Sequence, residues 1–177
     1  MPDPISGTVI PCLAVPPHDR YIDETDAPPF LNLSAMLPDL DTIIQNFEIL
    51  DDPLDRYEYV IELGKLMPKM PDDAKVEDNR VFGCESQVWI DVSQADGAGR
   101  PALKLNGDSD SHIVKGFVAL MVALFDGKKP AHAMEADGFD LLKRLDFGSH
   151  ITSKRSNGVR AMVDRIHKDA ARLRALN

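Results

Sequence analysis

The spacing of apolar residues predicts two helices at the start of a globular region that begins near Ser34. Apolar residues between 43 and 50 recur at helical intervals and predict a first short helix. Asp52-Pro53 is typical of an N-cap followed by the first helical position, and Pro68 ends the second helix. We expect this second helix to bury a stripe made of Tyr57, Val60, Ile61 and Gly64.

Candidate strands lie within residues 75–105, with a turn signal over 94–101. In 88–93, Val88, Ile90 and Val92 fall on one face. Residues 102–105 form a second candidate strand, and 75–81 form a weaker third. Because no helix lies between them to make a parallel crossover, we expect a small antiparallel sheet of about three strands.

Helices follow this predicted sheet. Residues 107–111 form a polar turn that leads into a helix over 112–125, which is apolar on nearly all sides and therefore central. A shorter helix over 137–145 is expected to end at Gly148, and a last helix to span 156–176. The predicted fold class is α+β, a small antiparallel sheet packed against several helices.

Composition and charge distinguish an N-terminal extension from the rest of the chain. Seven of its 13 prolines lie in residues 1–33, which predicts an irregular N-terminal extension before a domain over 34–177. The net charge is -9, and only 153–177 are basic, so binding to nucleic acid through overall basicity is not expected. The longest apolar run, Phe117–Phe125, is too short to span a bilayer, and no membrane association is expected.

The two cysteines, Cys12 and Cys84, are too few for a disulfide framework or for paired metal ligands. No two of the five histidines share a helix face at ligand spacing, so we expect neither a metal site nor a bound cofactor. Residues 1–17 have neither the basic start and apolar core of a signal peptide nor the arginines of a transit peptide. The expected location is the cytoplasm.

Cys84 is the main candidate for chemistry. It follows Gly83, which permits an unusual backbone turn, and it precedes a predicted strand, so the side chain can be presented to a partner. One alternative is a buried structural cysteine. Another is a self-contained hydrolase or thiol transferase in which His112 or His150 activates Cys84.

Arg155 is a second candidate. It lies in 153–158, just ahead of the last predicted helix, where serines can serve as caps. Its positive charge would favour a thiolate or a persulfide if it lay near Cys84. The alternative role of this segment, and of 107–110 ahead of the preceding helix, is ordinary helix capping.

Three blocks follow one another along the chain: Arg80-Val81-x-Gly83-Cys84-x-Ser86-Gln87-Val88-Trp89, Gly107-Asp108-Ser109-Asp110-x-x-Ile113-Val114-Lys115-Gly116 and Arg155-Ser156-Asn157-Gly158-x-x-Ala161-Met162. Together they resemble the SufE family, including its CsdE relatives, and the resemblance covers roughly 35–176. The sequence departs from the family pattern at two places. Glu85 stands where members often have Gln, and Ser153-Lys154 replace a common Pro-Ser.

The resemblance implies a sulfur-acceptor protein with an α+β fold like that of the scaffold protein IscU. A cysteine desulfurase of the SufS or CsdA type, which carries its own pyridoxal phosphate, would pass persulfide sulfur to Cys84 and be stimulated by doing so. The sulfur would go on to an iron–sulfur scaffold of the SufBCD type. The chain would be an accessory protein rather than an independent enzyme, and a second copy of it is a further candidate partner.

The expected site centres on Cys84, with Arg155 as possible support for the sulfur anion. Phe82 is expected to anchor the cysteine loop and Gly83 to act as its hinge. The residues expected to border the cysteine or to contact a partner are Phe82, Gly83, Glu85, Ser86, Gln87, Asp108, Ser109 and Asp110.

Overall fold

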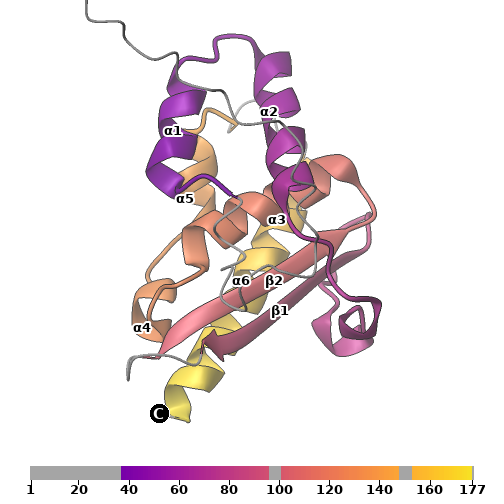
Figure 1. The fold of residues 1–177 in the computed structure, drawn as a ribbon, viewed down its shortest axis with the longest axis vertical. Helices are drawn as coiled ribbons and strands as arrows, with labels where there is room; N and C mark the ends of the chain where they lie inside the picture. Colours follow the sequence, from indigo (N-terminus) through magenta and orange to yellow (C-terminus); the bar gives the residue numbers. More distant parts are fainter. Residues whose placement is uncertain (1–36, 96–100, 148–152, 177) are drawn as a thin grey trace, which may run out of the picture. The chain divides into compact units, whose positions relative to one another are not determined.

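A computed structural model describes residues 37–95, 101–147 and 153–176, without the side chains of Ser153 and Lys154. It confirms the α+β class, with a two-stranded sheet and several helices (Figure 1). The predicted N-terminal extension and the expected stop at Gly148 lie outside the described residues. The elements are α1 (Leu40–Glu48), α2 (Pro53–Leu66), the 3₁₀ turns η2 (Asp72–Ala74) and η3 (Glu77–Asn79), β1 (Val88–Ala95), β2 (Ala102–Ser109), α3 (His112–Phe125), α4 (Pro130–Ala133), α5 (Gly138–Arg144) and α6 (Ser153–Ala175).

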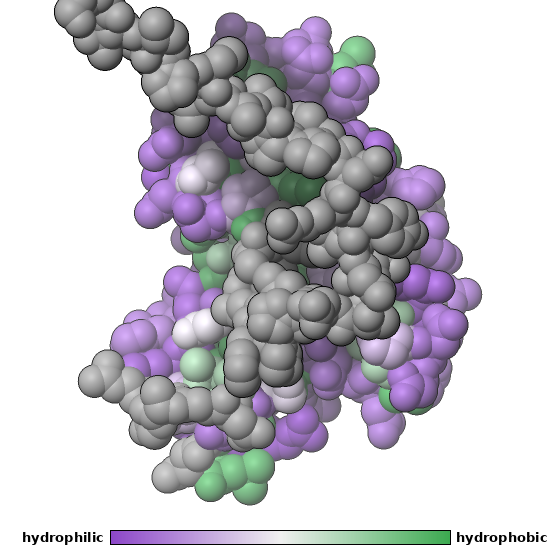
Figure 2. Space-filling view, in the orientation of Figure 1, coloured by the Kyte–Doolittle hydropathy of each residue, from purple (hydrophilic) through white to green (hydrophobic). Residues whose placement is uncertain are grey.

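The helical predictions for α1, α2, α3 and α5 are confirmed. The Asp52 carboxylate accepts a hydrogen bond from Leu54 N–H, as expected of an N-cap. The predicted buried stripe of α2 is confirmed only at Val60 and Gly64. Tyr57 and Ile61 are half-buried, and the omitted Leu63 is fully buried. The helix lies against α3 with Gly64 facing Gly116, which centres its buried face on Val60, Leu63 and Gly64. The outer sides of α1 and α2 are largely hydrophilic (Figure 2).

The sheet pairs β1 with β2 in antiparallel register, Val88 opposite Ser109 and Ala95 opposite Ala102. The alternation in β1 is confirmed, with Val88, Ile90 and Val92 buried. The predicted third strand over 75–81 was wrong. Acidic residues at the start of η2 and η3 favour the first turn of a helix and are poor strand formers, so only an isolated bridge from Arg80 to Trp89 extends the sheet.

The predicted polar turn over 107–111 was also wrong, because β2 continues through Ser109. Asp108, the residue that most strongly suggests a turn, is buried and 4% exposed. Its Oδ2 lies 2.9 Å from Lys75 Nζ and its Oδ1 lies 3.0 Å from Lys115 Nζ. Ser109 N–H also donates to Asp108 Oδ1. Paired in this way, a charged residue can occupy a strand position inside the fold.

Helix α6 passes behind the two strands in the view of Figure 1 and packs against β1, and α3 packs against β2. The last helix begins at Ser153, three residues earlier than predicted, so Arg155 lies in its first turn. The four-residue helix α4 was not predicted. None of the described helices is both long and apolar enough to cross a membrane.

Two carboxylates, the buried Asp108 and the half-buried Asp126, have pKa values shifted in opposite directions. Burial raises the pKa of Asp108, but hydrogen bonds from Lys75, Lys115 and Ser109 N–H outweigh it, and the pKa lies below its usual value. Asp126 at the end of α3 accepts a hydrogen bond from Leu105 N–H, yet burial prevails and raises its pKa. The negative end of the α3 dipole adds to the cost of that charge.

We expect Asp108→Asn to lower the free energy of unfolding at pH 7 by about 2–3 kcal/mol, because two lysines lose their common counterion. Asp126→Asn, the matched control, keeps an acceptor for Leu105 and loses a disfavoured charge. It should be neutral or stabilising, by up to about 1 kcal/mol. Urea unfolding of the three proteins measures both changes.

The pH dependence of the change in unfolding free energy should also differ in sign between Asp108→Asn and Asp126→Asn. A lowered pKa means that the contribution of the Asp108 carboxylate is present above its unfolded pKa and is lost as the pH falls through the folded value. The deficit of Asp108→Asn should therefore shrink in acid, whereas the advantage of Asp126→Asn should grow as the pH rises through the raised pKa of Asp126. Equal effects of the two substitutions at pH 7 would contradict this account.

Candidate functional site

Cys84 lies in a loop, residues 82–87, whose two ends are fixed to the sheet. At the first end, Val81 N–H donates to Val88 O over 2.9 Å, and the Val81 side chain is buried. At the second end, Gln87 N–H donates to Asp110 Oδ1 over 3.0 Å, and Ser109 Oγ donates to Gln87 O over 2.8 Å. These bonds define the position from which the cysteine is presented.

The structure corrects the role expected for Phe82. Its side chain is 64% exposed, with the Arg80 guanidinium 5.5 Å from the ring centroid, so it does not anchor the loop from inside. The buried neighbour Val81 does so instead, because the bridge to β1 turns residue 81 inward and residue 82 outward. Phe82 is left as an exposed aromatic side chain two positions before the cysteine.

Gly83 makes the turn that brings Cys84 against α6. Its φ is +101°, in the region that residues with a Cβ rarely adopt, so a glycine is required there. The half-buried thiol of Cys84 is free, and its Sγ lies only 3.0 Å from the point where a Cβ on Gly158 would stand. The cysteine therefore rests directly on the backbone of the last helix.

A cavity of about 350 Å³ opens beside Cys84. It brings Cys84 together with Glu85, Ser86 and Arg155, four of the residues predicted from the sequence. The remaining lining residues come from α3, its N-cap and α6. They are Ser111, Ile113, Val114, Phe117, Gly158, Val159 and Met162.

The electrostatics of this cavity favour negative charge. The first turn of α3, capped by Ser111, and the first turns of α6 both contribute to its lining. Helix N-termini carry partial positive charge and backbone N–H groups that stabilise anions. Arg155 adds a full charge, and its guanidinium lies 5.5 Å from the centroid of the Tyr57 ring. The Glu85 carboxylate in the same lining is the opposing charge.

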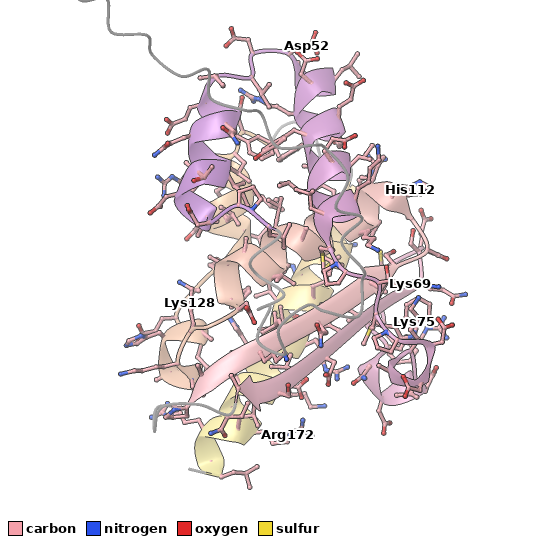
Figure 3. All side chains as sticks on the ribbon, viewed as in Figure 1. Asp52, Lys69, Lys75, His112, Lys128 and Arg172 are labelled. Atoms are coloured by element: carbon pink, nitrogen blue, oxygen red, sulfur yellow. The ribbon has the colours of Figure 1, made fainter. Side chains whose placement is uncertain are left out.

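The other predicted residues lie outside this lining. Asp108 was expected at the surface near the cysteine, but it is buried with Lys75 and Lys115, so it supports the fold and is not available for contact. Ser109 and Asp110 hold Gln87 in place. None of the described cavity residues is a histidine. His112 is exposed at the start of α3 (Figure 3), and His150 falls outside the described residues.

Sequence reasoning quoted Gly158 in a motif but gave it no role. The signal was present, because it is the only glycine in 153–175 and glycine is unfavourable inside a helix. The apolar cavity wall made by Val114, Phe117 and Met162 was not predicted as part of a site, since periodicity cannot distinguish a cavity wall from a packed interior. Within the described ranges, no group of three His, Cys, Asp or Glu side chains is arranged to hold a metal ion.

The family model of SufE, described as an Fe-S metabolism associated domain, matches residues 41–170. The chain belongs to the SufE family. This match includes the cysteine loop, both strands and the helices that line the cavity. Membership places the protein in sulfur transfer for Fe-S metabolism.

Similar proteins agree with this assignment. A SufE-like protein of Rhizobium meliloti strain 1021, described as uncharacterized, is 43% identical over 131 residues, which cover 74% of this chain and 94% of the relative. A SufE-like protein of Rhizobium etli, also described as uncharacterized, is 41% identical over 131 residues, 74% of this chain and 88% of the relative. The solution structure of a hypothetical protein from Thermus thermophilus shares the fold, with a TM-score of 0.61, 19% identity and coverage of 79% of this chain and 98% of that one.

We expect Arg155→Ala to slow alkylation of Cys84 by a small thiol reagent about two- to fivefold, because the guanidinium favours the anionic sulfur that reacts. Arg160→Ala is the matched control. It removes the same charge from an exposed position of α6 that faces Phe139. Equal rates for the two variants at one pH would restrict Arg155 to a structural role.

Proposed function

We propose that this SufE-family protein accepts persulfide sulfur on Cys84 from a pyridoxal-phosphate-dependent cysteine desulfurase, of the SufS or CsdA type. It stimulates that enzyme and delivers the sulfur to an iron–sulfur scaffold of the SufBCD type. One observation carries the proposal. A free cysteine stands on a glycine turn, half-covered, at a cavity formed by Arg155 and the N-termini of two helices.

The transfer is a thiol–disulfide type exchange. The thiolate Sγ of Cys84 attacks the terminal sulfur of the persulfide on the desulfurase, a new S–S bond forms, and the donor S–S bond breaks. The donor cysteine leaves as a thiolate and takes up the proton that Cys84 gives up, so no external oxidant or reductant is needed. Removing this sulfur returns the desulfurase to its starting state, which is the physical basis for stimulation.

The surroundings suit a carrier. The N-termini of α3 and α6 and Arg155 stabilise the persulfide anion, and the apolar wall of the cavity limits water around it. Glu85, at the rim, adds a negative charge that counteracts this stabilisation and favours release toward an acceptor. Pyridoxal phosphate belongs to the partner, and the proposed chemistry needs no cofactor on this chain. A reducing compartment such as the cytoplasm keeps the thiol available.

We expect Cys84→Ser to fold normally and to lose both sulfur acceptance and desulfurase stimulation, because serine cannot form an S–S bond. Cys12→Ser, the matched control, should retain both. The measurement is intact mass after incubation with a desulfurase and cysteine, which detects the addition of a sulfur atom. Acceptance by Cys84→Ser, or its loss in Cys12→Ser, would refute the assignment of Cys84 as the acceptor.

A further inference from the structure

The segment 79–84 follows one face of α6. Near its start, Arg165 Nη2 donates to Asn79 Oδ1 over 3.5 Å. Further along, a Cβ built on Gly83 would lie 3.5 Å from Ala161 Cβ, and Cys84 Sγ rests on Gly158. The helix positions 165, 161 and 158 are neighbours on one helical face. The loop therefore lies in a fixed register on α6, and its last contact is made by the sulfur.

Gly158 lies at a place where the helix would otherwise favour alanine. It is buried in the second turn of a 23-residue helix, between Asn157 and Val159. An interior glycine weakens a helix relative to alanine. The structure shows what its missing side chain permits, because the space that a Cβ would take is bounded by Cys84 Sγ at 3.0 Å and Cys84 Cβ at 3.5 Å.

We propose that Gly158 is the positioning residue that sets how deeply the Cys84 sulfur rests in its cavity. With hydrogen in place of a side chain, α6 lets the thiol lie against its backbone beside Arg155. A methyl group at residue 158 would displace the sulfur away from the helix. Since α6 lies on the inner side of the loop, and Phe82, Gly83 and Glu85 on the loop are exposed, this displacement is directed toward solvent.

A consequence for sulfur transfer rests on the proposed function. The resting contact on Gly158 holds the nucleophile away from bulky reactants, so a desulfurase must lift Cys84 off α6 before transfer. The depth at which the Cys84 sulfur rests in its cavity then sets how much sulfur transfer depends on contact with the partner. If the Cys84 sulfur lies less deeply, sulfur acceptance depends less on the partner, and the bound sulfur is more accessible to small thiols.

The test is the rate at which Cys84 reacts with a bulky maleimide in the full chain. We expect Gly158→Ala to react about tenfold faster than wild type, equivalent to about 1.4 kcal/mol, a typical cost of inserting a methyl group into a packed site. Asn157→Ala is the matched control, because it adds helix propensity at the neighbouring exposed position and should leave the rate unchanged. Thermal unfolding checks that each variant is folded.

Several outcomes would overturn the proposal. They are an unchanged or slower maleimide rate in folded Gly158→Ala, or an equal acceleration in Asn157→Ala. If Gly158→Ala is less stable than wild type, the maleimide rates are compared at a temperature at which thermal unfolding shows every variant to be folded. Intact-mass measurement of sulfur acceptance is a separate arm. Absence of sulfur on wild-type Cys84 would refute the proposed function, whereas the maleimide contrast would still decide the role of Gly158.

Discussion

The buried carboxylate of Asp108 is the constraint on which the arrangement around the cysteine depends. A buried charge must keep its counterions, and here they come from two different segments, Lys75 ahead of the cysteine loop and Lys115 in α3. Lys75 Nζ also lies 5.6 Å from the centroid of the Trp89 ring on β1. One carboxylate thus ties β2, α3 and the segment leading to residue 80 together. The position of Asp108 and its two lysines therefore fixes where the cysteine loop begins.

The cavity follows from that arrangement. The hydrogen bond from Val81 N–H to Val88 O closes the cysteine loop, residues 82–87. The loop therefore crosses the ends of the helices that pack against the sheet. These are α3 and α6, and both present their N-terminal turns. The lining of the cavity therefore combines backbone dipoles of two helices with the side chains of Arg155 and Glu85. Such a site suits a step that moves a sulfur atom between cysteines and requires only one nucleophile.

Sequence reasoning succeeded where local rules determine the structure. Helical periodicity, the Asp52 cap and the alternation in β1 predicted these elements, and the three sequence blocks identified the family. It failed where a distant partner overrides a local preference. Asp108 suggests a turn until its two lysines are known, and 75–81 look like a strand until the short 3₁₀ turns replace it. The contact between Gly158 and Cys84 joins residues 74 positions apart, which no local pattern encodes.

The two glycines around the cysteine have a common physical meaning. Gly83 allows a backbone conformation that other residues avoid, and Gly158 allows an approach to α6 that a side chain would prevent. Each reduces the intrinsic stability of its own segment, the loop in one case and the helix in the other. A structural cysteine in the core would require neither glycine. Together they place the Cys84 thiol against the backbone of α6, where it is half-buried at the surface of the core.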